Sequence, residues 1–420
     1  MVDADQTFVI VGGGLAGAKA AETLRSEGFT GRVILIGDER DHPYERPPLS
    51  KGYLTGKEER DSVFVHEAAW YARAEVELHL GQPVTTVDRE ARTVRLGDGT
   101  TIRYDRLLLA TGSEPRRLDV PGTGLAGVHH LRRLAHADRL RHVLAALGRD
   151  NGHLVIAGGG WIGLEVAAAA RGYGAEVTVV ESEPTPLHQV LGPELGQLFA
   201  DLHTEHGVRF VFGARLAEIV GQDGMVLAVR TDDGEEHPAH AVLAAIGAAP
   251  RTALAEAAGL ALVDRAHGGG IAVDASLRTS DPDIFAAGDV AAAHHPLLDT
   301  RLRVEHWANA LNGGPAAARA MLGQHVSYDR VPYFFSDQYD LGMEYSGWAP
   351  PGSYDQVVIR GDAGKRQFIA FWLKDRKVLA GMNVNVWDVT DTVQGLIRAQ
   401  SPVDPDALAD PSVPLESLLA

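Results

Sequence analysis

The sequence predicts an α/β protein in which two domains each contain a parallel βαβ unit and a third, C-terminal domain is α+β. One pattern occurs twice, as VIVGGGLAGAKAA at residues 9–21 and as VIAGGGWIGLEVA at residues 155–167. Residues 326–400 instead contain short alternating segments separated by turns, which is typical of antiparallel strands. The 420 residues suffice for two or three domains, each with its own core.

The first repeat begins with an apolar run at Phe8–Val11, which predicts a buried strand. The glycines that follow it in the order G-x-G-x-x-G are Gly12, Gly14 and Gly17. In a Rossmann-like unit the first glycine permits a tight turn, the second lets the backbone approach a pyrophosphate, and the third lets the helix pack on the strand. The next strand-like stretch, RVILIGDE, ends in Asp38 and Glu39, and an acid there can accept hydrogen bonds from the ribose hydroxyls of adenosine.

The second repeat has the same parts. Leu154–Ala157 predicts a strand, and its glycines are Gly158, Gly160 and Gly163. The stretch EVTVVESE then places Glu181 at a strand end. A single glycine-rich turn in an Ala- and Gly-rich chain is a weak signal, but two complete copies favour two dinucleotide sites.

Three further segments complete the predicted organisation. Leu107–Ala110 reads as a buried strand that leads into a glycine turn. Ile284–Ala287 reads as a short strand before Asp289, which is placed to cap a helix or to meet a ligand at a helix N-terminus. The Pro- and Asp-rich tail SPVDPDALADPSVPLESLL is expected to wrap the surface.

Composition excludes several classes of protein. The net charge of −17 disfavours nucleic acid and anionic membranes as partners, although solubility alone also explains it. The sequence has no cysteine, which excludes a disulfide framework, a thiolate nucleophile and a protein-held iron–sulfur cluster. No signal-peptide pattern and no long apolar run is visible, so we expect a cytoplasmic protein.

Two nucleotide sites in one chain suggest a transfer of electrons between two cofactors. FAD and NAD(P)H both contain an ADP half, which explains why the same glycine pattern occurs twice. We therefore expect a resident flavin and a visiting nicotinamide, with the redox chemistry carried by the cofactors because the protein supplies no thiol.

The whole chain resembles the FAD-dependent, NADH-using ferredoxin reductases of the putidaredoxin reductase and biphenyl-dioxygenase reductase type. The motifs that carry this resemblance are VIVGGGLAGAKAAETLR, ERPPLSKGYL, LLLATGSEPR, VIAGGGWIGLEVAAAA, TSDPDIFAAGDVA, EHWANA and FFSDQYDLGMEYSG. It implies a glutathione-reductase-like fold with an FAD domain at residues 1–115 and 245–325. It also implies a NAD domain at 116–244 and a C-terminal α+β domain at 326–420.

The resemblance also implies site residues. Those expected to contact FAD are Gly12, Gly14, Ala16, Asp38 (with Glu39 as its competitor), Arg46, Lys51, Val84, Ala110, Arg132, Asp289 and Trp307. Those expected to contact NADH are Gly158, Gly160, Ile162, Gly163, Glu165, Glu181 and Gly247.

Three of these residues carry expected catalytic roles. Lys51 would stabilise negative charge on the reduced flavin, Glu165 would pair with Lys51, and Trp307 would lie against the flavin and nicotinamide rings. Each also has a plain structural interpretation. Lys51 could be a surface residue, Glu165 a first-turn helix acid, and Trp307 part of the core. No metal site is expected, since the adjacent His294 and His295 would point to opposite sides of a strand.

The missing cysteine also selects the electron acceptor. Relatives that reduce disulfides, peroxide or coenzyme A disulfide need a redox cysteine, so the expected acceptor is an iron–sulfur ferredoxin that serves a cytochrome P450 or a dioxygenase. Rubredoxin is the nearest alternative. An NADH-binding flavoprotein resembling apoptosis-inducing factor, acting through partner contacts, is another. Quinone reduction at a membrane is disfavoured because no amphipathic C-terminal helix is apparent.

The expected assembly is a monomer or weak dimer, and Arg301, Arg303 and Arg330 are candidates for docking the ferredoxin. One segment departs from the family. LNGGPAAARA follows EHWANA, where relatives carry a longer polar or basic stretch, and this puts the docking surface in doubt.

Overall fold

The structure is a computed structural model that describes residues 5–419. The chain forms two compact units. The first comprises residues up to Glu45 together with 60–114 and 249–332, and the second comprises 46–59, 115–248 and the residues from Tyr333 onward. Each unit is described by itself.

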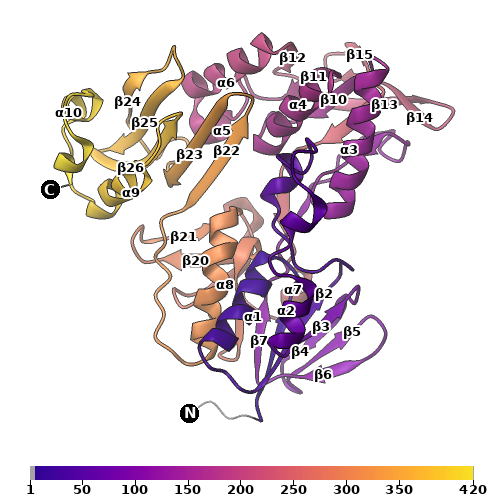
Figure 1. Cartoon of the computed structure of the whole chain (residues 1–420), viewed down its shortest axis with the longest axis vertical. Coiled ribbons are helices and arrows are strands. Elements are labelled where there is room, and N and C mark those ends of the chain that lie inside the picture. Colours follow the sequence, from indigo (N-terminus) through magenta and orange to yellow (C-terminus); the bar gives the residue numbers. More distant parts are fainter. Residues whose placement is uncertain (1–4, 420) are drawn as a thin grey trace. The chain divides into compact units, whose positions relative to one another are not determined.

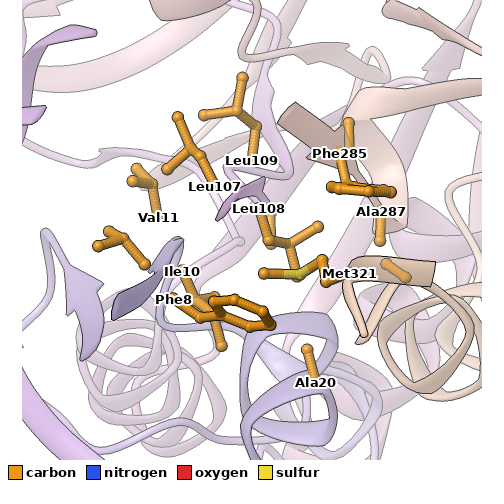
Figure 2. Packing of buried hydrophobic residues seen from close by; sticks show 14 of the residues in the cluster. Phe8, Ile10, Val11, Ala20, Leu107, Leu108, Leu109, Phe285, Ala287 and Met321 are labelled. Atoms are coloured by element: carbon orange, nitrogen blue, oxygen red, sulfur yellow. The ribbon is translucent and has the colours of Figure 1, made fainter. Parts of the chain in front are cut away.

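The first unit is built on a five-stranded parallel sheet with the order β19-β7-β1-β2-β3. Its strands are β1 (Thr7–Val11), β2 (Arg32–Gly37), β3 (Val76–Leu80), β7 (Arg106–Leu109) and β19 (Ile284–Ala286). The apolar runs of β1, β2 and β7 are buried along their length because helices cover a parallel sheet on both faces. Phe8, Leu108, Phe285 and Met321 are among the core residues that these elements bring together (Figure 2).

Helix α1 (Leu15–Ser26) packs closely against α8 (Trp307–Met321) in this unit (Figure 1). A Cβ atom on Gly314 would lie 2.2 Å from the carbonyl oxygen of Ala16, so only glycine allows this approach. Ala317 and Ala318 are also fully buried. The segment LNGGPAAARA is therefore small-residue packing between helices, which explains its composition without any role in docking.

The remaining elements of the first unit are short. They are η2 (Arg60–Val63), α2 (Ala68–Arg73), α7 (Ala253–Ala257), η3 (Arg265–His267), η4 (Gly288–Val290), an antiparallel sheet of β4 (Val84–Asp88), β5 (Thr93–Leu96) and β6 (Thr101–Arg103), and a second small sheet of β18 (Ile271–Val273), β20 (Ala291–His295) and β21 (Thr300–Arg303). Strands β8 (Ser113–Pro115) and β17 (Ala248–Pro250) lie where the chain passes between the units.

The second unit contains another parallel sheet, with the order β12-β11-β10-β16-β9. Its strands are β9 (Val128–His129), β10 (His153–Ala157), β11 (Glu176–Glu181), β12 (Val208–Phe212) and β16 (Ala241–Ala244). The helices of this part are α3 (Leu134–Arg149), α4 (Trp161–Tyr173), α5 (His188–Leu191) and α6 (Pro193–Glu205); η1 (Pro47–Ser50) and an antiparallel sheet of β13 (Leu216–Gln222), β14 (Met225–Thr231) and β15 (Glu236–Pro238) complete it.

Residues from Tyr333 onward form a five-stranded antiparallel sheet with the order β22-β23-β26-β25-β24 (Figure 1). The strands are β22 (Tyr333–Gln338), β23 (Leu341–Gly347), β24 (Gln356–Asp362), β25 (Gln367–Lys374) and β26 (Lys377–Val384); they are followed by α9 (Thr390–Ala399), α10 (Pro405–Ala409) and η5 (Leu415–Leu418). The tail is anchored by the Arg360 guanidinium, which donates hydrogen bonds to the carbonyl oxygens of Asp410 and Val413 at 2.6 and 2.7 Å.

The predicted fold class is confirmed, with two parallel α/β sheets and a C-terminal antiparallel domain. Three details differ from the sequence-based expectation. Asp289 lies inside the short turn η4 and does not cap a helix. Residues 46–59 group with the second unit. An amphipathic helix does occur near the C-terminus, but the apolar residues of α9, including Leu396 and Ile397, are fully buried, and the helix packs against β26 and β23.

Candidate dinucleotide sites and the Lys51–Glu165 centre

The first glycine motif lies where β1 gives way to α1. Gly12 has φ of 131°, and a Cβ there would fall 2.0 Å from the carbonyl oxygen of Ala110, at the end of neighbouring β7. A Cβ on Gly17 would fall 2.1 Å from the carbonyl oxygen of Gly12, whereas a Cβ on Gly14 would meet nothing within 4 Å. Two glycines are thus required by the fold, and Gly14, the N-cap of α1, faces open space.

The second motif repeats this geometry. A Cβ on Gly158 would fall 2.5 Å from the carbonyl oxygen of Ala245, and one on Gly163 would fall 2.2 Å from that of Gly158. Gly160, the N-cap of α4, again has nothing within 4 Å. Both motifs also lie where the strand order reverses, between β1 and β7 and between β10 and β16. A ligand-binding site is expected at such a switch point, and the open second glycine in each copy fits a pyrophosphate.

The predicted ribose acids differ between the copies. Glu181 is the last residue of β11, and its carboxylate accepts hydrogen bonds from the backbone N–H groups of Gly159 at 2.6 Å and Glu183 at 2.9 Å. It is therefore held at the edge of the second glycine turn. The position that matches Glu181 in the register of β2 is Gly37, whose Cα lies close to Gly13.

The first copy therefore carries its acid one residue later. Asp38 forms an ion pair with Arg251 at 3.1 Å, and Arg251 is a residue that the sequence pattern did not identify. Glu39, the competing acid, accepts a hydrogen bond from the Tyr44 hydroxyl at 2.7 Å. Val84, the first residue of β4, follows a turn that bonds back to β2, since the N–H of Gln82 donates to the carbonyl oxygen of Gly37 at 2.9 Å.

Asp289 is 8% exposed and follows β19, whose C-terminal end lies at the same sheet edge as those of β1 and β7. Desolvation lowers the pKa of the nearby His306 to about 4, against the attraction of the Asp289 carboxylate. Trp307 begins α8, and its indole N–H donates a hydrogen bond to Glu45 at 3.0 Å. The hydrogen bond to Glu45 fixes one edge of the indole ring, and the Trp307 side chain as a whole is only partly buried.

The structure brings Lys51 and Glu165 together within the second unit. The Nζ of Lys51 lies 2.6 Å from Oε1 of Glu165, and the two side chains are 15% and 4% exposed. The Glu165 carboxylate also accepts hydrogen bonds from the hydroxyls of Ser50 at 2.5 Å and Ser336 at 2.6 Å. We call these four residues, Ser50, Lys51, Glu165 and Ser336, the Lys51–Glu165 centre. They come from the loop at η1, from α4 and from β22, three segments far apart in the sequence.

Aromatic and acidic groups surround the Lys51 ammonium. Its Nζ lies 5.3 Å from the centre of the Phe335 ring, within range of a cation–π interaction. Desolvation raises the pKa of Asp337, and Glu165 adds to this effect while Lys51 opposes it. The sequence singled out Lys51 and Glu165, whereas Ser50, Ser336 and Phe335 carried no signal that connected them to either residue.

The other predicted residues of the second unit are placed as follows. The Arg46 guanidinium donates a hydrogen bond to the carbonyl oxygen of Arg132, so these two residues are in contact. Gly247 has φ of 89°, and its carbonyl oxygen accepts a hydrogen bond from the N–H of Arg116 at 2.9 Å. Ile162 is 44% exposed, and Ile246, beside Gly247, is 37% exposed. Two exposed isoleucines near one glycine turn offer an apolar surface to a ligand, and Ile246 was missed by the sequence analysis.

The arginines proposed for docking do not share one environment. The Arg301 guanidinium donates to the carbonyl oxygens of Val273 and Ala292 at 2.7 and 2.6 Å. The Arg303 side chain is 12% exposed and donates to the carbonyl oxygen of Gly268 at 2.6 Å. Both therefore brace the backbone of their own unit, and Arg303 in particular is not a free surface charge.

Comparison with known proteins places this geometry in a family. Residues 6–314 match the model described as pyridine nucleotide-disulphide oxidoreductase, and residues 333–419 match the model described as reductase C-terminal. The chain belongs to the ferredoxin reductases of the pyridine nucleotide-disulphide oxidoreductase family.

Individual relatives cover this ferredoxin reductase from end to end. The probable ferredoxin reductase CtmF of Castellaniella defragrans is 39% identical, with 99% of this chain and 100% of the relative covered. The putidaredoxin reductase CamA of Pseudomonas putida is 37% identical, with 100% and 98% covered. The crystal structure of the covalent putidaredoxin reductase–putidaredoxin complex matches with a TM-score of 0.93 at 36% identity, covering 99% of each chain.

Two further observations apply to the described part of this reductase. No helix within residues 5–419 is long and apolar enough to cross a membrane. Over the same residues, no group of three or more His, Asp or Glu side chains is arranged to hold a metal ion.

Proposed function

We propose that this reductase binds FAD at the Gly12–Gly17 motif and NADH at the Gly158–Gly163 motif, and passes electrons singly to an iron–sulfur ferredoxin. The observation that carries this proposal is the duplicated glycine geometry. In each motif the first and third glycines are sterically required, and the middle glycine faces open space. The proposal includes an FAD domain at 1–115 and 245–325, a NAD domain at 116–244 and a C-terminal domain at 326–420, with residues 46–59 of the first range grouped in the second compact unit.

The bound cofactors supply hydride transfer from nicotinamide to flavin, so the chain's residues bind, orient and stabilise charge. The backbone N–H groups at the starts of α1 and α4 would hold the pyrophosphates. Glu181 would accept hydrogen bonds from the adenosine ribose. Glu165 holds the Lys51 ammonium in one position, and an ammonium fixed in this way stabilises negative charge that develops on a reacting group.

The first experiment tests the two sites directly. The purified protein should contain one non-covalent FAD per chain, which acid or heat releases. Covalent flavin, or FMN in place of FAD, would overturn the assignment. Gly160→Val should fold, because the Cβ position is open, and should lose NADH binding while it retains FAD. The matched control is Gly163→Val, which should impair folding because its Cβ would meet a backbone oxygen.

The second experiment tests the acceptor. NADH-driven reduction of cytochrome c should depend on an added ferredoxin, measured with a panel that includes ferredoxins of P450 systems, ferredoxins of dioxygenase systems and rubredoxins. Dependence on rubredoxin alone would change the acceptor and leave the reductase assignment intact. A long-lived NADH complex with no turnover toward any carrier would favour a protein that acts through partner contacts. The expected cytoplasmic location remains a prediction that cell fractionation tests.

A further inference from the structure

A chain of polar side chains continues from the Lys51–Glu165 centre into the interior of the second unit. The Nε2 of Gln338 lies 3.1 Å from the hydroxyl of Ser336, and the Oε1 of Gln338 lies 2.8 Å from Nε2 of His203. The Nδ1 of His203 lies 3.3 Å from the hydroxyl of Tyr339. Ser336, Gln338 and His203 are all buried, with exposed fractions of 1% or less.

The chemistry of each group fixes the direction of this chain. The Glu165 carboxylate only accepts hydrogen bonds, so the Ser336 hydroxyl must donate to it and can accept only from the Gln338 NH₂ group. The Gln338 carbonyl then faces His203, which requires the proton of the imidazole to be on Nε2. Nδ1 is left as an acceptor for the Tyr339 hydroxyl. Each donor therefore points toward Glu165.

We propose that Gln338 and His203 are positioning residues for Glu165, acting through Ser336 to hold the carboxylate where it pairs with Lys51. This inference rests on the proposed function, since it assigns residues to the support of the reductase reaction. Both residues act by restricting the Ser336 hydroxyl, which bonds to the same carboxylate oxygen, Oε1, as Lys51 does.

The elements that supply the chain are suited to this role. Ser336 and Gln338 lie two residues apart on β22, so both point to the same face of the strand. His203 lies in the last turn of α6, and its ring makes an edge contact with Tyr339. Desolvation lowers the pKa of His203 to about 4, so the imidazole is neutral at neutral pH, as the direction of the chain requires. In a buried site such a network restricts side-chain rotation more than water-exposed hydrogen bonds do.

The central experiment uses the FAD-loaded enzyme and stopped-flow bleaching of the flavin by NADH. In Gln338→Met the Ser336 hydroxyl loses the donor that orients it, and we expect the limiting rate of flavin reduction to fall roughly 3–10-fold, the range of one net hydrogen bond. The apparent Kd for NADH should not change. Ser336→Ala should give a similar loss, and Gln338→Met added to Ser336→Ala should cause no further loss of rate, because the two act in series.

A spectroscopic readout is independent of activity. With histidine-selective nitrogen labelling, the signal missing from His203→Gln identifies His203, and it should show the Nε2–H tautomer in the native protein. Gln338→Met should change the tautomer ratio of His203. Tyr339→Phe, which removes only the hydroxyl at the outer end of the chain from a partly buried side chain, provides a milder variant in case the buried substitutions fail to fold, and it should also change the tautomer ratio of His203.

The chain offers a matched control in the same C-terminal domain. Gln394 on α9 donates a hydrogen bond to the buried Ser346 at 3.2 Å, which is the same pair of groups placed where α9 packs on β23. Gln394→Met should lower the unfolding temperature and leave the rate of flavin reduction unchanged. If Gln338→Met behaves like this control, or if its effect adds fully to that of Ser336→Ala, the inference is wrong. If NADH does not bleach the native flavin at all, the proposed function fails instead.

Discussion

Removing the charge of Glu165 should strongly destabilise the second unit. Most of this loss of stability should be recovered when the charge of Lys51 is removed as well. The two atoms lie 2.6 Å apart in side chains that are 4% and 15% exposed. At an effective dielectric constant near 20, their attraction is about 6 kcal/mol, and desolvation offsets part of it. Breaking a buried pair by removing one partner typically costs about 3–5 kcal/mol, because the other charge is left buried and unpaired.

The perturbation is Glu165→Gln, which preserves the volume and leaves both serine hydroxyls with a partner. A loss of about 3 kcal/mol corresponds to a fall of roughly 6–12 °C in the unfolding temperature of a unit of this size. Calorimetry of Glu165→Gln, Lys51→Met and the double variant completes a double-mutant cycle. We expect the double variant to be more stable than Glu165→Gln alone.

The same cycle read by flavin reduction separates stability from catalysis. The double variant should have a higher unfolding temperature than Glu165→Gln. Its rate of flavin reduction should stay low, since the Lys51 ammonium is missing. If the losses of unfolding free energy in the two single variants simply add in the double variant, the two charges do not interact energetically. The ion pair then contributes nothing to stability, and the reasoning is refuted.

Three further predictions concern individual residues. Lys51→Ala should lower the limiting rate of flavin reduction by stopped flow about 10²–10³-fold, as expected for loss of one charge-assisted group at a reacting centre, and an unchanged rate would assign Lys51 a surface role. NADH should be preferred to NADPH by about one decade in kcat/KM, because a 2′-phosphate would lie against Glu181 at a cost of roughly 1–2 kcal/mol after screening; Glu181→Ala with Ser182→Arg should shift the preference toward NADPH, and equal kcat/KM values in the native enzyme would remove Glu181 from the site. The pKa of His203 is lowered to about 4 by desolvation, so between about pH 6.5 and 4 the unfolded chain binds a proton that the folded chain does not, and stability should fall as the pH drops through this range. Calorimetry of His203→Gln should show a shallower dependence of unfolding free energy on pH than the native protein. An identical dependence would contradict the assignment.

The sequence was most informative where a single local requirement has few solutions. A βαβ unit that binds a pyrophosphate needs glycine at the two positions where a Cβ would meet a backbone oxygen. Both copies of the motif can therefore be recognised in the sequence. Continuous apolar runs such as Phe8–Val11 likewise predict strands that are buried on both faces. The spacing of the glycines belongs to one βαβ unit of about 30 residues, so a pattern of residue types predicts it. The oxygens that a Cβ on Gly12 or Gly158 would meet belong instead to Ala110 and Ala245, and only the folded sheet brings them close.

Other features of the site could not be predicted from the sequence. The acid of the first copy lies one position later than that of the second, and its partner Arg251 is more than two hundred residues away in the sequence. The segment LNGGPAAARA suggested a change in docking, whereas Gly314 is required by the close packing of α8 on α1 and Ala317 and Ala318 are fully buried. Arg303 was predicted as a surface charge and is instead held by the carbonyl oxygens of Gly268 and Asp289 and by the carboxylate of Glu305.

The sequence by itself determined that this protein contains two dinucleotide motifs, has no redox thiol and ends in an antiparallel domain. It also singled out Lys51 and Glu165 as separate candidates. Only the tertiary structure decided that these two side chains meet, and that Ser50, Ser336, Gln338 and His203 support them. The physical reason is that a buried charge needs several partners at once, and here they come from η1, α4, α6 and β22. No pattern within any one of these segments specifies the others, since packing alone brings them together.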